Sequence, residues 1–116
     1  MSQTLPKYET VKNISHRFSL DREAVRMILG ISESTQFRYE KNNPILKPTL
    51  ADRLERFQRM TLQAIELFED EAEAKRWLST SKKSLDGLSP WQALATDAGA
   101  KKVENLLYMA EYGIFG

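Results

Sequence analysis

Catalysis would require titratable side chains close together, and the sequence offers two candidate sets. His16 is the single histidine, and Ser15 beside it is no sign of a catalytic pair, because adjacent residues do not face each other. The other set is a run of acids that resembles paired carboxylates: Glu69, Asp70, Glu71 and Glu73. These acids stand at a predicted helix start, where negative charge stabilises the helix dipole. We therefore predict no catalytic residue in either set.

The sequence also lacks the usual means of holding a metal or a cofactor. It has no cysteine, which excludes a thiolate metal site, a thiol nucleophile and a disulfide framework. The stretch DGLSP does not have the pattern of a glycine-rich phosphate loop. We expect a protein that is not an enzyme and that has no metal, no cofactor and no small-molecule substrate.

Composition and charge favour macromolecular partners. No apolar run approaches the roughly 18 residues that span a bilayer, and MSQTLPKYET is unlike a signal peptide. We therefore expect a cytoplasmic protein with no membrane partner. Residues 1–61 carry 11 Lys and Arg against 7 Asp and Glu, whereas residues 62–116 carry 6 against 9. A basic front half suits a polyanion, and an acidic back half suits a protein partner.

Helical periodicity predicts an all-α protein, because the alternation typical of strands is nearly absent. The polar stretch 1–15 predicts no element. Beyond it, EDEAEA opens one helix, and capping residues predict the starts of the others at Ser19, Ser32, Thr49, Ser89 and Thr96. The prolines of PILKP indicate a boundary. We predict an N-terminal module of residues 1–47, followed by a compact helical domain of residues 48–116.

The first two predicted helices are short and are joined by LGIS, which is typical of a helix-turn-helix. Gly30 supplies the tight turn, and the second helix of such a pair lies in the DNA major groove. The residues of that helix expected to face DNA bases and phosphates are Ser34, Thr35, Gln36, Arg38 and Lys41. The alternative is that the pair is simply two helices of a bundle.

Two residues depart from the usual helix-turn-helix pattern. Arg26 stands where a small residue is usual before the turn glycine, and Gln36 stands where an apolar residue is usual after it. Either the pair packs at an unusual angle, with Phe37 and Tyr39 filling in, or DNA binding is weak.

The helix predicted from Thr49 carries two apolar stripes in its second half. The main stripe comprises Leu50, Leu54, Phe57, Thr61, Ile65 and Phe68. The second stripe comprises Met60, Ala64 and Leu67. Because one chain offers only one core, we predict a homodimer through this helix. The alternative is that both stripes are buried within a monomer.

The last predicted helix also has two faces. At 100° per residue, one arc of about 100° holds its core residues, which are Gly99, Val103, Leu106, Leu107 and Ala110. Tyr108 and Tyr112 fall near the opposite side, and Phe115 would join them if the helix ran on. Gly113 is placed to end the helix. The tyrosines are either covered by another helix or exposed for a partner, and tyrosine is enriched at interface centres.

The C-terminal half resembles a known family in the order of its motifs. AIELFEDEAEAKRWL is followed by a loop, by GLSPWQALAT, by DAGAKKVENLL and by EYGIF. This order is similar to the toxin-binding domain of the Xre/MbcA/ParS family of type II antitoxins, and the helix-turn-helix ahead of it matches the Xre type. The resemblance covers roughly residues 17–116.

The resemblance implies a protein partner, a RES-domain toxin that consumes NAD or transfers its ADP-ribose. It also implies that the antitoxin obstructs the toxin's NAD cleft, dimerises and represses its own operon through operator DNA. Together with the aromatic face of the last predicted helix, the resemblance implies toxin binding at the C-terminal end, on Tyr108, Glu111, Tyr112, Gly113, Ile114 and Phe115. The rival interpretation is a transcriptional regulator whose C-terminal half only dimerises.

Overall fold

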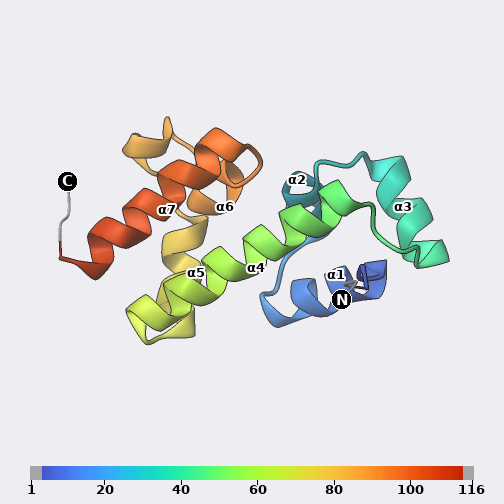
Figure 1. The fold of residues 1–116 in the computed structure, drawn as a ribbon, viewed down its shortest axis with the longest axis horizontal. Coiled ribbons are helices and arrows are strands. Elements are labelled where there is room, and N and C mark those ends of the chain that lie inside the picture. The colour runs from blue at the N-terminus through green and yellow to red at the C-terminus, as the bar shows by residue number, and fades with distance from the viewer. Residues whose placement is uncertain (1–3, 114–116) are drawn as a thin grey trace. The chain divides into compact units, whose positions relative to one another are not determined.

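The computed structural model describes residues 4–113, and their regular structure is helical apart from one isolated bridge between Lys7 and Ile45. The elements are α1 (Tyr8–Arg17), α2 (Arg22–Leu29), α3 (Glu33–Asn42), α4 (Pro48–Phe68), α5 (Glu71–Ser79), the 3-10 turn η1 (Lys83–Leu85), α6 (Pro90–Ala93) and α7 (Asp97–Glu111) (Figure 1). The predicted all-α class is therefore confirmed. In the described residues, no helix has both the length and the apolarity to cross a membrane.

The chain divides into two compact units, residues 1–55 and residues 56–116. The division falls inside α4, whereas the prolines predicted it after residue 47. Pro44 and Pro48 instead enclose a segment that packs into the first unit, because Leu46 is buried and its N–H donates to the carbonyl of Pro6.

Most helix starts follow the predicted caps. Ser32 accepts a backbone hydrogen bond at the start of α3, Ser89 forms a capping box at α6, and Thr96 caps α7. Two predicted caps are wrong. Asp21 caps α2, since Ser19 lies in a left-handed turn before it, and α4 begins at Pro48, so that Thr49 lies in its first turn.

Helix α1 forms in the stretch for which the sequence predicted no element. It buries Tyr8, Val11 and Ile14, which recur every third residue among polar neighbours. Tyr8 packs edge-to-face against Tyr39 of α3, with ring centres 5.7 Å apart. Burial raises the pKa of the Tyr8 hydroxyl. The first unit thus has a third helix, α1, which packs against α3 of the helix-turn-helix pair.

The turn between α2 and α3 requires a glycine for two reasons. Gly30 has a φ of 68°, a left-handed conformation that side chains disfavour. A side chain there would also displace the guanidinium of Arg53, which donates a 3.0 Å hydrogen bond to the carbonyl of Leu29, so that this bond would be lost. The arginine therefore ties the start of α4 to this turn.

The two unusual residues of the helix pair bond to each other. Gln36 is 1% exposed, and its Oε1 accepts a 2.7 Å hydrogen bond from Nη1 of Arg26. Its Nε2 donates to the carbonyl of Arg22 at 2.9 Å. The prediction that Gln36 faces outward toward DNA is therefore wrong, because its amide fills the core position and is satisfied there.

The proposed replacement of that core residue by aromatics is correct only in part. Tyr39 is half-buried against Tyr8, but Phe37 points outward and is 62% exposed. Phe37 does not fill the core because Gln36 already occupies the inner side of α3.

The second half of α4 belongs to the second unit and is buried on two sides. Phe57 lies 5.5 Å from the ring of Trp91, and Trp91 Nε1 donates to Thr61 Oγ1 at 3.0 Å. Met60 and Ala64 are also buried within the single chain. Leu67, the third residue of this stripe, is half-buried. The argument for a homodimer through the second stripe is therefore wrong for Met60 and Ala64, and dimerisation itself stays a prediction.

Helix α7 packs closely on α6 at its first turn. A side chain at Gly99 would overlap the carbonyl oxygen of Ala93, which explains why a glycine lies at this position of the helix. Arg56 of α4 binds the turn between α6 and α7, because it donates to the carbonyl of Leu94 and to the carboxylate of Asp97, each at 2.6 Å. The start of α7 is thereby fixed to α4.

We predict that Arg26→Ala and Gln36→Ala each lower the free energy of unfolding by about 1–3 kcal/mol, because each leaves a polar group without its partner. The double variant should lose less than the sum of the two, with a coupling of about 0.5 kcal/mol or more. Urea unfolding measures these values. The exposed Ser34→Ala on the same helix is the matched control, with a change within about 0.5 kcal/mol. Additive losses would show that the pair is not coupled.

We also predict that Gly99→Ala destabilises the second unit by about 1–3 kcal/mol, because the added methyl forces α6 and α7 apart. Lys101→Ala, at an exposed position of the same helix, is the control. Thermal unfolding followed by circular dichroism compares the two variants. A Gly99→Ala variant as stable as the control would contradict the close approach of the two helices.

Candidate DNA-binding and protein-binding surfaces

The outward face of α3 carries four exposed residues at helical spacing: Ser34, Phe37, Arg38 and Lys41. At 100° per residue they occupy an arc of about 100°. Three of them were predicted from the sequence. Phe37 was not, although its spacing of three and four residues from Ser34 and Lys41 already placed it on this face. The face combines two cationic side chains, a hydroxyl and an aromatic ring.

Thr35 lies at the edge of that face and is half-buried. Its hydroxyl accepts from Ser32 at 3.0 Å and from Nη2 of Arg38 at 3.2 Å. Thr35 therefore holds Arg38 against the start of α3, which limits the positions of the guanidinium before any ligand arrives.

Arg22 of α2 borders the same face but is already paired. It donates two hydrogen bonds to Glu40, at 3.1 and 2.9 Å, and lies 3.9 Å from Glu33. The hydrogen bond from Arg22 lowers the pKa of the Glu40 carboxyl, so that the pair stays charged well below neutral pH. The charge available for a polyanion on this face therefore comes mainly from Arg38 and Lys41.

A shallow depression of about 940 Å³ lies on the surface of the helix pair. Its lining residues come from α2 and α3, and they are Arg22, Glu33, Ser34, Phe37 and Arg38. Phe37 contributes the apolar part of this lining. A ligand seated there meets an aromatic ring with charged side chains around it.

The C-terminal end of α7 presents a pair of tyrosines. Tyr108 and Tyr112 are 57% and 63% exposed, and their ring centres lie 4.7 Å apart. Val103 and Leu107 on the opposite side are buried. The predicted two-faced helix is thus confirmed, and the alternative in which another helix of the chain covers the tyrosines is wrong.

Helix α7 ends just before Gly113, as the sequence predicted. Tyr112 is the C-terminal cap, and Gly113 has a φ of 72°, a left-handed conformation that side chains disfavour. The exposed Glu111 precedes them. Ile114 and Phe115, which were also expected to bind a partner, lie outside the described residues.

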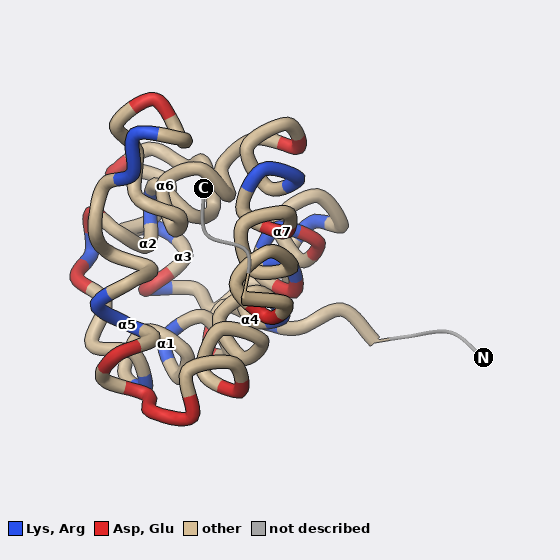
Figure 2. Tube along the Cα trace, turned by 90° about the vertical axis from the view of Figure 1, so that its left-hand side faces the viewer, with Lys and Arg blue, Asp and Glu red and all other residues tan. Residues whose placement is uncertain are grey.

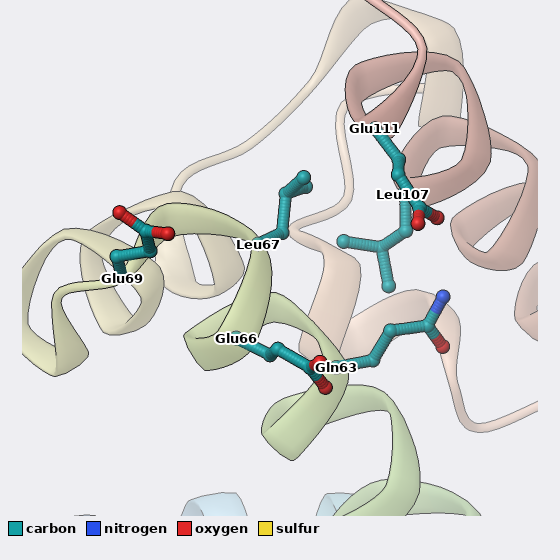
Figure 3. Close-up of a pocket in the computed structure, with 6 residues that line it drawn as sticks. All are labelled: Gln63, Glu66, Leu67, Glu69, Leu107 and Glu111. Carbon is teal, nitrogen blue, oxygen red and sulfur yellow. The ribbon is translucent and has the colours of Figure 1, made fainter.

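A pocket of about 440 Å³ opens between the end of α4 and α7, beside the tyrosine pair. Six residues line it: Gln63, Glu66, Leu67, Glu69, Leu107 and Glu111 (Figure 3). Figure 3 shows Leu107 and Glu111 projecting from α7 toward α4. The pocket has an apolar floor and an acidic rim, and Glu111 belongs both to this rim and to the turn of α7 that carries the tyrosines.

Acidic residues gather at the turn between α4 and α5 (Figure 2). The predicted structural role of these acids is confirmed for Asp70, whose carboxylate caps α5 by accepting from two backbone N–H groups. Glu73 forms an ion pair with Arg76. Among the residues that the structure describes, no group of three potential metal ligands is placed to hold an ion.

Two known protein families match the chain, one mainly over the first unit and one over the second. Residues 6–59 match the Antitoxin Xre-like helix-turn-helix domain, and residues 63–113 match the Antitoxin Xre/MbcA/ParS C-terminal toxin-binding domain. Together the two matches cover both candidate surfaces, α3 in the first and the tyrosine pair in the second.

Two curated relatives carry the name Antitoxin Xre. The chain is 40% identical to one from Pseudomonas putida over 79 residues, which cover 66% of this chain and 49% of the relative. It is 31% identical to one from Yersinia enterocolitica over 98 residues, which cover 84% of this chain and 66% of the relative. The chain thus spans between half and two thirds of these relatives. With both family matches in the expected order, the chain belongs to the Xre/MbcA/ParS family of antitoxins.

Proposed function

We propose that the chain is the antitoxin of a type II toxin–antitoxin system and that its C-terminal region binds and obstructs the NAD-site cleft of a RES-domain toxin. The observation that carries the proposal is the exposed pair Tyr108 and Tyr112 at the end of a helix whose other side is buried. The toxin class and the cleft come from the family resemblance. The second activity we propose is repression of its own operon through α3.

The geometry of α7 suits a binding element. Arg56 and the close packing at Gly99 hold the start of the helix, so the aromatic end is presented on a fixed support. Two adjacent tyrosine rings, tilted by 44° to each other, offer a large contact area with little conformational entropy to lose. Glu111 beside them can accept from a cationic group of the toxin, and such charge-assisted hydrogen bonds are the stronger kind. Ile114 and Phe115 extend the proposed contact.

We expect that changing Tyr108 and Tyr112 together to alanine weakens toxin binding by roughly thirtyfold or more, since truncation of a central aromatic anchor typically costs about 2 kcal/mol. Calorimetry with the purified protein of the adjacent toxin reading frame measures the affinity. Leu88→Ala, an exposed apolar residue elsewhere in the same unit, is the matched control.

Both variants should keep the helical circular dichroism signal, because the buried side of α7 is unchanged. A folded double-alanine variant that binds the toxin with unchanged affinity, and still protects cells from it, would contradict the assignment.

For DNA, we propose that α3 enters the major groove with Ser34, Arg38 and Lys41 toward the duplex, and that Thr35 supports Arg38. The exposed face of α3 and the match to an Xre-like helix-turn-helix domain support this role. We also propose a homodimer, because helix-turn-helix proteins read two half-sites about one helical turn apart. The second stripe of α4 plays no part in this proposal.

Changing Arg38 or Lys41 to alanine should weaken binding to the promoter DNA of its operon. Each change should also reduce the slope of log affinity against log salt by about one, as the loss of one phosphate contact does. Mobility shift at several salt concentrations measures both quantities. Lys101→Ala, an exposed lysine of the second unit, should change neither. Absence of DNA binding by the unchanged chain at low salt would refute this activity.

A further inference from the structure

On α3, a polar residue is buried and the apolar residue next to it is exposed, which is the reverse of the usual arrangement. Gln36 is buried with both ends of its amide bonded, while its neighbour Phe37 is 62% exposed. Phe37 is therefore not needed in the core, because Gln36 occupies the buried position of α3 and its amide is hydrogen-bonded there. The exposed ring calls for another explanation.

The surroundings of Phe37 are charged and polar. The shallow depression that it lines is otherwise made by Arg22, Glu33, Ser34 and Arg38. The centres of protein–protein interfaces are depleted in lysine and glutamate, and Phe37 has the exposed Glu33 and Lys41 four residues before and after it, so the ring is a poor centre for one. A polyanion that presents a small apolar group among polar atoms fits this face better.

The DNA major groove has that chemistry. Its edges present hydrogen-bond donors and acceptors, and the C5-methyl of thymine is its apolar group. Phe37 lies on the same face as Arg38 and Lys41, the cations proposed to meet phosphates, and beside Ser34, whose hydroxyl can reach a base edge. Phe37 lies at one edge of the exposed arc, between Glu33 and Lys41, which are four residues before and after it. Helix α3 thus carries an apolar contact beside the cationic side chains of its exposed face.

We propose that Phe37 is a specificity-determining residue that packs on the C5-methyl group of a thymine in each half-site. This inference rests on the proposed DNA binding and adds to it the base that is read. The phosphate contacts of Arg38 and Lys41 position the helix and are independent of sequence, whereas the contact of Phe37 discriminates between bases.

The test removes the methyl group and the ring separately. The probe is a duplex selected from a random pool by the full chain, in which each thymine is replaced in turn by deoxyuridine, which lacks only the methyl. For the unchanged chain, we expect one replacement per half-site to weaken binding about fourfold, the value of one buried methyl. For Phe37→Ala, the same replacement should have no effect, while the salt dependence stays unchanged.

Ile45→Ala is the matched control, because it removes an exposed apolar side chain of the same unit outside α3 and should retain the deoxyuridine effect. Phe37→Leu should retain part of the effect. The inference is overturned if no replacement weakens the unchanged chain, if the effect persists in Phe37→Ala, or if Phe37→Ala unfolds. It is also overturned if Phe37→Ala impairs toxin binding or self-association but not the effect.

A chain that binds no duplex at low salt overturns the proposed DNA binding together with this inference. A chain that binds DNA but ignores the methyl overturns the inference alone.

Discussion

Two arginines of α4, Arg53 and Arg56, bind the turns that precede α3 and α7, and both candidate surfaces depend on these turns. Arg53, in the first unit, donates to the carbonyl of Leu29 at the turn before α3. Arg56, in the second unit, donates to the carbonyl of Leu94 and to Asp97 at the turn before α7. The bonds to Leu29 and Leu94 each satisfy a backbone carbonyl at a helix end, where such groups lack a partner within the helix. The helix that would meet DNA and the helix that would meet a toxin are thus each anchored at their start.

In the helix-turn-helix pair, the two residues that depart from the usual pattern, Arg26 and Gln36, compensate for each other. An arginine in place of a small residue and a glutamine in place of an apolar one would each be costly alone, because a buried polar group without a partner loses its hydration. Arg26 and Gln36 bond to each other, so the two departures compensate. This arrangement fills the inner side of α3 and leaves the outer face, with Phe37, free for a ligand.

Much of this fold could be predicted from local signals in the sequence. The caps at Ser32 and Thr96 and the two faces of α7 follow from residue types and helical spacing, which act within one helix. What could not be predicted depends on contacts between segments far apart in the sequence. Gln36 appeared exposed because its partner Arg26 lies on another helix. Met60 appeared available for a dimer, but the fold of the single chain buries it. Helix α1 was missed because its polar residues hide three buried ones.

The central claim is that two separate surfaces of this protein bind two different macromolecules. Hydrogen exchange of the full chain, measured alone, with promoter DNA and with the toxin, tests it most directly, because bound surfaces exchange more slowly. The account predicts that the toxin protects the C-terminal half of α7 and leaves α3 unchanged, and that DNA protects α3 and leaves α7 unchanged. Protection of α3 by the toxin, or no protection of α7 by a toxin that binds, would contradict it.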